Sequence, residues 1–328
     1  MPENPDWIPY RTSYYKDSWG FCLSQNQFNS LVDGEYEVVI DSSLEKGSLT
    51  YGEYFIQGES EEQILISCHC CHPSLANDNL SGIAVAVSLA QALAKAPKKY
   101  SYRFVFIPGT IGAIAWLAQN QKNLASIRHG IVLTGMGNDG PLTYKKSRMG
   151  NAEIDRTALQ VLKSLGETFD IREFSPYGYD ERQYCSPGFN LPVGRLSRTP
   201  YGEYPEYHTS ADNMSFISKE KLIAARDALE KIFSVLEIQE YFINSEPYGE
   251  VQLGRRGLYR PSGGAGSEEM AFLWLLNLCD GTRSLFDIAD QSQIALPKLI
   301  EAKNILVEKS LLHLAKIGER ISARDSVQ

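Results

Sequence analysis

Short apolar segments alternate with longer amphipathic ones through the middle of the chain. The short segments are rich in β-branched and aromatic residues, which is typical of buried strands: Gln63–Cys68, Tyr102–Ile107, Gly130–Thr134 and Leu191–Leu196. The longer segments repeat apolar residues at helical spacing: Ser81–Ala96, Ile111–Leu124, Ala152–Leu165 and Ser218–Tyr241. Because strands that alternate with helices pair within one sheet, this pattern predicts an α/β core, a mixed and mostly parallel sheet sandwiched by helices.

The regions on either side of this core differ from it in composition. Residues 1–48 are rich in Tyr, Ser and Asn, and we expect a small accessory segment there with one short strand at Tyr36–Ile40. The core then covers residues 49–245. The glycine-rich stretch Gly254–Gly266 indicates a linker within residues 246–266.

Residues 267–328 have the pattern of a small winged-helix domain. Helical spacing predicts three helices, Glu268–Leu278, Leu285–Gln291 and Leu296–Glu308. The turn Cys279–Thr282 separates the first two. The wing is expected to begin within Ser310–Leu314. Residues 265–328 hold seven Lys and Arg against nine Asp and Glu. We therefore expect this domain to contact a protein, peptide or carrier, and not nucleic acid.

Composition and charge narrow the class of protein further. The net charge of −8 argues against a surface that binds nucleic acid. The longest apolar run, Gly82–Ala96, is too short to span a bilayer, and the polar, proline-containing start of the chain is unlike a signal peptide. We expect a soluble cytoplasmic protein without a membrane partner, and the sequence is compatible with a homo-oligomer.

Metal-binding side chains gather where the first predicted core strand ends. His69 and His72 lie at this end, Asp78 comes nine residues after His69, and His208 lies in a polar loop before the last core helix. Ligands of α/β sheets bind at the carboxyl ends of strands, and catalytic zinc takes three imidazole or carboxylate ligands and keeps an open position. The sequence thus predicts a zinc site of His69, Asp78 and His208. The alternative is a core histidine and an aspartate that caps a helix.

Other polar residues are candidates for the same site. His72 is either a further ligand or a cap of the loop before Pro73. Asp180 and Glu181 follow each other in a loop rich in Gly, Tyr and Pro. They are either solvated loop charges, or Asp180 is a ligand or orienting group and Glu181 is the general base.

Arginine and tyrosine side chains are candidates for substrate binding. Arg11, Arg182 and Arg198 could hold a substrate carboxylate, because a guanidinium group binds carboxylates through two parallel hydrogen bonds. A surface or structural ion pair is the commoner role for any one of these arginines. Tyr207 could line the pocket with its ring.

These residues resemble a known signature. His69, Ala76–Gly82 and Tyr207–Asp212 resemble the motifs of co-catalytic zinc aminopeptidases, a superfamily that includes glutaminyl cyclase. The chain also resembles, almost from end to end, a bacterial group with an aminopeptidase-like domain and a C-terminal winged helix, apart from an N-terminal region that we expect this chain to lack. The resemblance implies that Asp78 bridges two zinc ions, with His69 binding one and His208 the other.

The sequence departs from the superfamily at several carboxylates. Gly109 and Thr110 stand where the superfamily has a general base and a ligand, both Glu. Thr134 replaces a ligand Asp, and Cys71 replaces the Asp that orients His69. We therefore expect one or two zinc ions in a non-standard site.

The resemblance implies a zinc-dependent hydrolase that cleaves an amide or peptide-like bond of a small molecule or peptide, of aminopeptidase or biosynthetic N-deacylase type. One alternative is a single-zinc acyl transferase or cyclase. Another is a catalytically silent module that binds a metal or a peptide.

Overall fold

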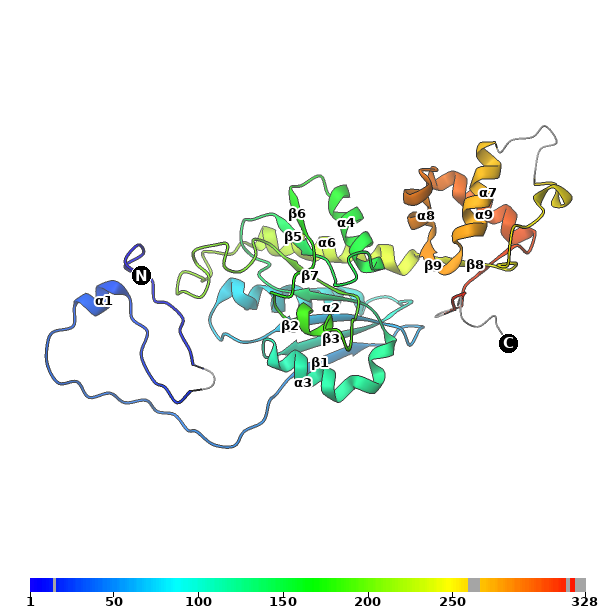
Figure 1. Cartoon of the computed structure of the whole chain (residues 1–328). Coiled ribbons are helices and arrows are strands. Elements are labelled where there is room, and N and C mark those ends of the chain that lie inside the picture. The colour runs from blue at the N-terminus through cyan, green and yellow to red at the C-terminus, as the bar shows by residue number, and fades with distance from the viewer. Residues whose placement is uncertain (14–15, 259–265, 317–318, 322–328) are drawn as a thin grey trace. The chain divides into compact units, whose positions relative to one another are not determined.

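The chain divides into two units. The computed structural model describes residues 1–13, 16–258, 266–316 and 319–321. The first unit is Met1–Glu237 and the second is Ile238–Gln328; Figure 1 labels their elements. This division falls before the expected boundary at residue 245, because the strand β8 (Tyr241–Asn244) pairs with strands of the second unit.

The first unit is built on a mixed sheet. Among the residues that the structure describes, seven strands follow the order β1-β3-β2-β4-β7-β5-β6. Their bounds are Gly52–Ile56 (β1), Gln63–His69 (β2), Ser101–Ile107 (β3), Ile127–Leu133 (β4), Leu142–Lys145 (β5), Phe169–Arg172 (β6) and Val193–Ser197 (β7). The four strands β3, β2, β4 and β7 run parallel, whereas β1 and β5 pair antiparallel with their neighbours β3 and β7. The prediction of a mixed, mostly parallel sheet is confirmed.

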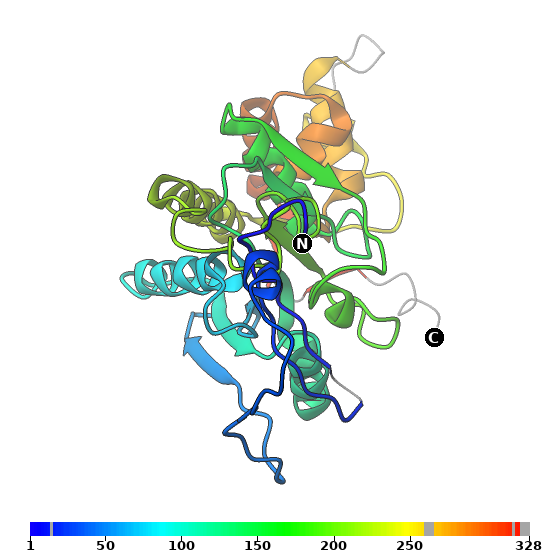
Figure 2. The same cartoon turned by 90° about the vertical axis from the view of Figure 1, so that its left-hand side faces the viewer.

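Helices cover both faces of this sheet, as Figure 2 shows. One face packs against α2 (Gly82–Leu93), α4 (Glu153–Ser164) and α6 (Lys219–Ile238). The other packs against α3 (Ile111–Asn120) and α5 (Glu181–Tyr184). Successive residues of a strand point to opposite faces. Accordingly, Ile64 of β2 lies in the first core cluster and Leu65 in the second, which explains the continuous apolar run of β2.

Some predicted elements differ from the structure. The expected strand Tyr36–Ile40 does not form; these residues are irregular and exposed, and Val39 is 75% exposed, so no sheet face buries them. In residues 1–48, the described helix is α1 (Gln25–Asn29). The predicted helix 218–241 ends at Ile238, and the predicted helix 111–124 ends at Asn120, where the 3-10 helix η2 (Gln121–Ser126) follows.

The second unit is a winged-helix domain. Its helices are α7 (Ser267–Leu278), α8 (Leu285–Ser292) and α9 (Leu296–Glu308). Its sheet has the order β10-β8-β9, with β9 at Asp280–Ser284 and β10 at Leu312–Leu314. The segment expected to be a turn, Cys279–Thr282, thus lies mostly within β9. Apolar side chains of all three helices form one core, among them Leu275, Ile288 and Leu299.

The expected linker lies only partly within the described residues. Its first part holds the 3-10 helix η3 (Leu253–Arg256), and residues 259–265 lie outside the described part of the chain. In the described ranges, none of the helices combines the length and the apolar character that a bilayer crossing needs.

Candidate metal centre

The site begins at a tight turn between β2 and α2. This turn, Ala76–Ser81, is a π-helical turn (η1) whose backbone leaves helical geometry at Asp78 and Asn79. The carboxylate of Asp212 accepts hydrogen bonds from the backbone N–H groups of Asn77 (2.5 Å) and Asp78 (3.0 Å). The side chain of Asn79 donates to the carbonyl of Leu133 (3.1 Å), at the end of β4. Asp78 is therefore held at the carboxyl edge of the sheet by contacts with two distant segments.

Three histidines surround the Asp78 carboxylate, which is almost fully buried. Its Oδ1 lies 2.9 Å from Nε2 of His69, and its Oδ2 lies 3.1 Å from Nε2 of His208. Nδ1 of His72 lies 3.1 Å from the backbone carbonyl of Asp78 and 3.5 Å from its Oδ2. The structure thus brings together all four residues that the sequence predicts as metal ligands.

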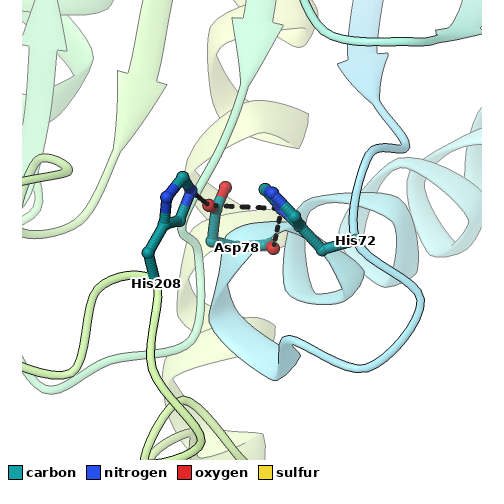
Figure 3. A group of neighbouring side chains, drawn as sticks. All are labelled: His72, Asp78 and His208. Carbon is teal, nitrogen blue, oxygen red and sulfur yellow. Dashed lines mark hydrogen bonds and ion pairs between the residues drawn. The ribbon is translucent and has the colours of Figure 1, made fainter. Parts of the chain in front are cut away.

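Within this set, His72, Asp78 and His208 form the tighter group. One potential ligand atom from each lies within 4.8 Å of the other two, and Figure 3 shows their side chains converging from separate segments. His69 approaches the opposite oxygen of Asp78. Its position is that of a residue that orients the carboxylate from outside the ligand group.

Tyrosine rings enclose the histidines. Tyr179 stacks on His69 with a centroid distance of 4.1 Å, and its hydroxyl donates to Oδ1 of Asp78 (3.3 Å). Tyr207, a predicted pocket residue, stacks on His208 at 3.9 Å. Tyr10 packs edge-on against both His72 and His208. The sequence carried no signal for Tyr10, because the contact depends on a return of the N-terminal segment to the core.

The charges of the cluster suit a cation. Burial raises the pKa of Asp78, but hydrogen bonds to His208 and His69 outweigh it and hold this pKa well below its usual range. Burial lowers the pKa of His72. An ionised carboxylate and a neutral imidazole are the forms that bind metal ions.

In the loop after β3, a side chain at position 109 would meet the side chain of Cys71. A Cβ built on Gly109 would lie 2.6 Å from Sγ of Cys71, and the backbone N–H of Gly109 donates to this sulfur over 2.8 Å. Burial raises the pKa of the Cys71 thiol to about 11. Cys71 therefore occupies the space as a neutral thiol.

A carboxylate from another segment reaches this loop. Oδ1 of Asp180 accepts a hydrogen bond from the backbone N–H of Thr110 over 2.7 Å. Asp180 is fully buried, and its Oδ2 has no hydrogen-bond partner among the described residues. Burial raises the pKa of Asp180 to about 6, although His69 and the Thr110 hydrogen bond lower it. Asp180 thus brings an acidic group to the loop that lacks both glutamates.

Glu181 does not fit the predicted role of general base. Its carboxylate is fully buried and lies 3.0 Å from Nζ of Lys145 and 3.6 Å from a nitrogen of Arg195. It also accepts a hydrogen bond from the backbone N–H of Tyr179 (3.0 Å). Because these groups already engage the carboxylate, Glu181 anchors the loop that carries Tyr179.

The predicted substrate arginines lie in three different settings. Arg198 is buried and donates to the backbone carbonyls of Met136, Gly140 and Lys221, so its guanidinium holds the fold together and the substrate-binding role does not fit it. Arg11 is exposed, directly after Tyr10, and its role stays a prediction. Arg182 lines a cavity that the residues of the metal cluster do not line.

Comparison with known proteins identifies the family. Residues 4–239 match the model of a family described as a domain of unknown function, DUF4910. The chain belongs to the DUF4910 family. Beyond the DUF4910 domain, residues 240–314 match a winged helix-turn-helix model.

A relative from Clostridium acetobutylicum shares both parts. It is 48% identical over 317 residues, which are 96% of this chain and 73% of the relative, and it is provisionally described as a polysaccharide biosynthesis protein with an aminopeptidase-like domain. A crystal structure from the same organism, provisionally described as a peptidase, matches with a TM-score of 0.78 and 46% identity over 96% of this chain and 72% of that one. The predicted resemblance to a group with an aminopeptidase-like domain and a winged helix is confirmed.

A more distant structure is similar to little more than half of the chain. The zinc aminopeptidase of Bacillus subtilis matches with a TM-score of 0.49 and 20% identity over 57% of this chain and 49% of that one. At this level of similarity, the match does not bear on the site.

Proposed function

We propose that this chain is a zinc-dependent hydrolase of an amide or N-acyl bond. The proposal rests on one observation, the convergence of ligand atoms from His72, Asp78 and His208 within 4.8 Å of one another. Two imidazoles and one carboxylate are a usual ligand set of catalytic zinc. The aminopeptidase-like description of the C. acetobutylicum relative supports the same chemistry.

The remaining contacts of Asp78 fit a metal ligand. His69 and Tyr179 both approach Oδ1, on the side away from the His208 contact with Oδ2. Such outer contacts orient a ligand carboxylate and leave its other oxygen for the metal. Zinc, when bound, supplies Lewis-acid polarisation of a carbonyl and increases the acidity of water.

Asp180 is our candidate for the proton acceptor. A general base works best when its pKa is close to the working pH, and burial brings the pKa of Asp180 to about 6. The backbone N–H of Thr110 holds Oδ1, which leaves Oδ2 without a partner in the described residues. This oxygen can take a proton without breaking an existing hydrogen bond.

The surroundings of the site suit a ring-shaped substrate. Tyr207 beside His208 is followed outward by Tyr201 (centroids 6.0 Å apart) and Tyr177 (a further 5.8 Å), and Tyr177 is 73% exposed. Flat aromatic faces can pack against the apolar face of a sugar ring while their hydroxyls contact its polar edge. Together with the polysaccharide role assigned to the relative, this favours an N-acyl amino sugar over a peptide.

The first test is the metal content of protein purified without added metal. We expect about one zinc per chain and its loss in His208→Ala. The zinc-loaded protein should release the acyl group from N-acyl amino sugars in a panel that also holds N-terminal aminoacyl amides. No metal after reconstitution with zinc would overturn the proposal and leave a binding module as the better account.

A single-zinc acyl transferase or cyclase is the second candidate. Gly109 and Thr110 favour it in part, since neither can activate water. In such an enzyme the nucleophile comes from the substrate, so a water-activating base matters less. Mass spectrometry of the products distinguishes the candidates, because hydrolysis adds the elements of water and transfer or cyclisation does not.

For the winged helix, we propose contact with a peptide or carrier. The excess of acidic over basic residues in 265–328 supports this. Binding to a duplex of mixed sequence at low salt, followed by fluorescence anisotropy, tests it, since nanomolar to micromolar affinity would contradict it.

A further inference from the structure

A cavity separate from the metal cluster lies in the DUF4910 domain. Its volume is about 360 Å³, within the size range of small-molecule sites. It is formed by the segment after β5, the segment after β6, and α5 with the turn that follows. Arg148, Phe174, Arg182 and Pro187 are among its lining residues, and the metal cluster contributes none.

The guanidinium of Arg182 has a donor, its buried Nε, that no described residue satisfies. In the described part of the chain it makes no hydrogen bond or ion pair, and its buried Nε is without an acceptor. A buried donor without an acceptor is costly for a folded protein. Arg182 is half-buried on α5 and faces the cavity, so an acceptor that enters the cavity would satisfy it.

A second arginine adds to the positive charge of this cavity. Arg148 is exposed, and its Nη1 donates to the side-chain oxygen of Asn190 over 2.9 Å. Among the described residues, no carboxylate forms an ion pair with Arg148, and no acidic residue lines the cavity. Two acidic groups precede Arg182 in the chain: Glu181 is already paired with Lys145, and Asp180, whose pKa burial raises and Arg182 lowers, accepts a hydrogen bond from the backbone N–H of Thr110.

The other walls are apolar. Phe174, Pro176 and Pro187 line the cavity, and the Phe174 ring lies 5.3 Å from Nζ of Lys145. This combination suits a ligand that joins a charged oxygen group to a flat apolar body.

We propose that this cavity binds an oxyanion, a carboxylate or a phosphate group, carried on a small molecule with an apolar face. The oxyanion contacts Arg182, whose planar fork matches it, and Arg148 contributes the second charge. The apolar face lies against Phe174. The site is independent of the proposed hydrolase and is not lined by its residues.

Titration calorimetry of the zinc-loaded full chain at fixed ionic strength tests this site. The probes are inorganic phosphate, phenyl phosphate, acetate and benzoate. They offer two anions, phosphate and carboxylate, each with and without an aromatic ring. We expect saturable binding of phenyl phosphate or benzoate, and Arg182→Gln to weaken it roughly ten- to a hundredfold, the range for a lost charged hydrogen bond. The stronger aromatic probe identifies the anion.

Two variants serve as controls. Arg226→Gln removes one positive charge from α6, where Arg226 pairs with Asp227, and should leave binding unchanged. His208→Ala separates the cavity from the metal cluster, since binding in the cavity should survive it. Binding that is lost in His208→Ala, unchanged in Arg182→Gln, or absent for all four probes would overturn the proposal.

Discussion

The backbone N–H of Tyr10 donates a hydrogen bond to the carbonyl oxygen of His208 over 2.7 Å, and the ring of Tyr10 packs edge-on against the His208 imidazole. Pro9 forms an isolated β-bridge with Thr209, and the backbone N–H of Ser210 donates to the carbonyl of Ile8. The N-terminal segment therefore positions the loop that carries a candidate metal ligand, and it is more than an accessory to the core.

Loss of the Tyr10 ring should weaken zinc binding. Tyr10 packs against both His72 and His208, so Tyr10→Ala releases two candidate ligands from one neighbour. We expect zinc affinity to fall roughly tenfold or more, the range for residues that support metal ligands. Competition with a chromophoric chelator measures it. Tyr10→Phe keeps the ring and should bind zinc as tightly as the parent chain. Equal zinc affinity of the parent chain and Tyr10→Ala would show that the contact does not support the metal ligands.

Substitution of His69 should separate a one-zinc site from a two-zinc site. His69 orients Asp78 in the structure and lies outside the tighter group. We expect His69→Gln to keep about one zinc per chain with weaker affinity, and His72→Ala to lose it. Elemental analysis gives both stoichiometries. Two zincs in the parent chain, with one lost in His69→Gln, would instead support the bridged site that the superfamily implies.

Asp180 should make the protein less stable at neutral pH. Burial raises the pKa of its carboxyl from 3.8 to about 6 in the fold, so the folded chain holds this proton at pH values where the unfolded chain has lost it. Stability from this group is then present at low pH and falls as pH rises from about 4 to 6. We expect Asp180→Asn to raise the free energy of unfolding of the zinc-free protein by about 2 to 3 kcal/mol above pH 6, and to abolish hydrolysis.

Urea unfolding at pH 4 and pH 7.5 measures this difference. The gain in Asp180→Asn should shrink to about 0.5 kcal/mol at pH 4, because the folded parent chain holds the proton there and the unfolded chain holds it in part. Asp227→Asn, at a half-exposed position on α6, should change stability by no more than about 0.5 kcal/mol. A variant that is less stable at both pH values would mean that Asp180 serves only to hold the Thr110 loop.

Glu181→Gln should impair folding more than chemistry. The substitution leaves the Lys145 ammonium buried beside a neutral amide, and loss of one partner of a buried ion pair costs roughly 3 to 5 kcal/mol. Chemical unfolding measures the loss. Adding Lys145→Met to Glu181→Gln removes the stranded charge and should recover much of it. A Glu181→Gln variant of parental stability without activity would restore Glu181 as the general base.

The sequence predicts those elements that have a pattern of their own. The strand β2 is buried on both faces and reads as one apolar run, so its prediction is accurate to one residue. The strands β5 and β6 are four residues each, which is too short for a clear pattern. β5 also ends in Lys145, which is buried although a charged residue predicts an exposed position. Phe242 and Ile243 of β8 continue the apolar pattern of α6, and only their pairing with β9 and β10 sets them apart.

In the candidate site too, some residues are predictable from the sequence and others are not. His69, Asp78 and His208 are predictable because zinc restricts the types of its ligands. Asp212, which accepts a hydrogen bond from the backbone N–H of Asp78, lies 134 residues away in the chain. No local sequence pattern indicates such a contact. The separate roles of the three charged residues Asp180–Arg182 could not be predicted from the sequence either. They point to three different surroundings: the Thr110 loop, Lys145, and a separate cavity.

The place of β8 decides how the chain can be dissected. β8 is the central strand of the small sheet, and it precedes the glycine-rich stretch that the sequence marks as a linker. A fragment cut at that stretch would keep β9 and β10 but lose the strand with which both pair, and would expose the edges of each to unwanted association. A self-sufficient C-terminal fragment must therefore begin ahead of Tyr241, directly after α6.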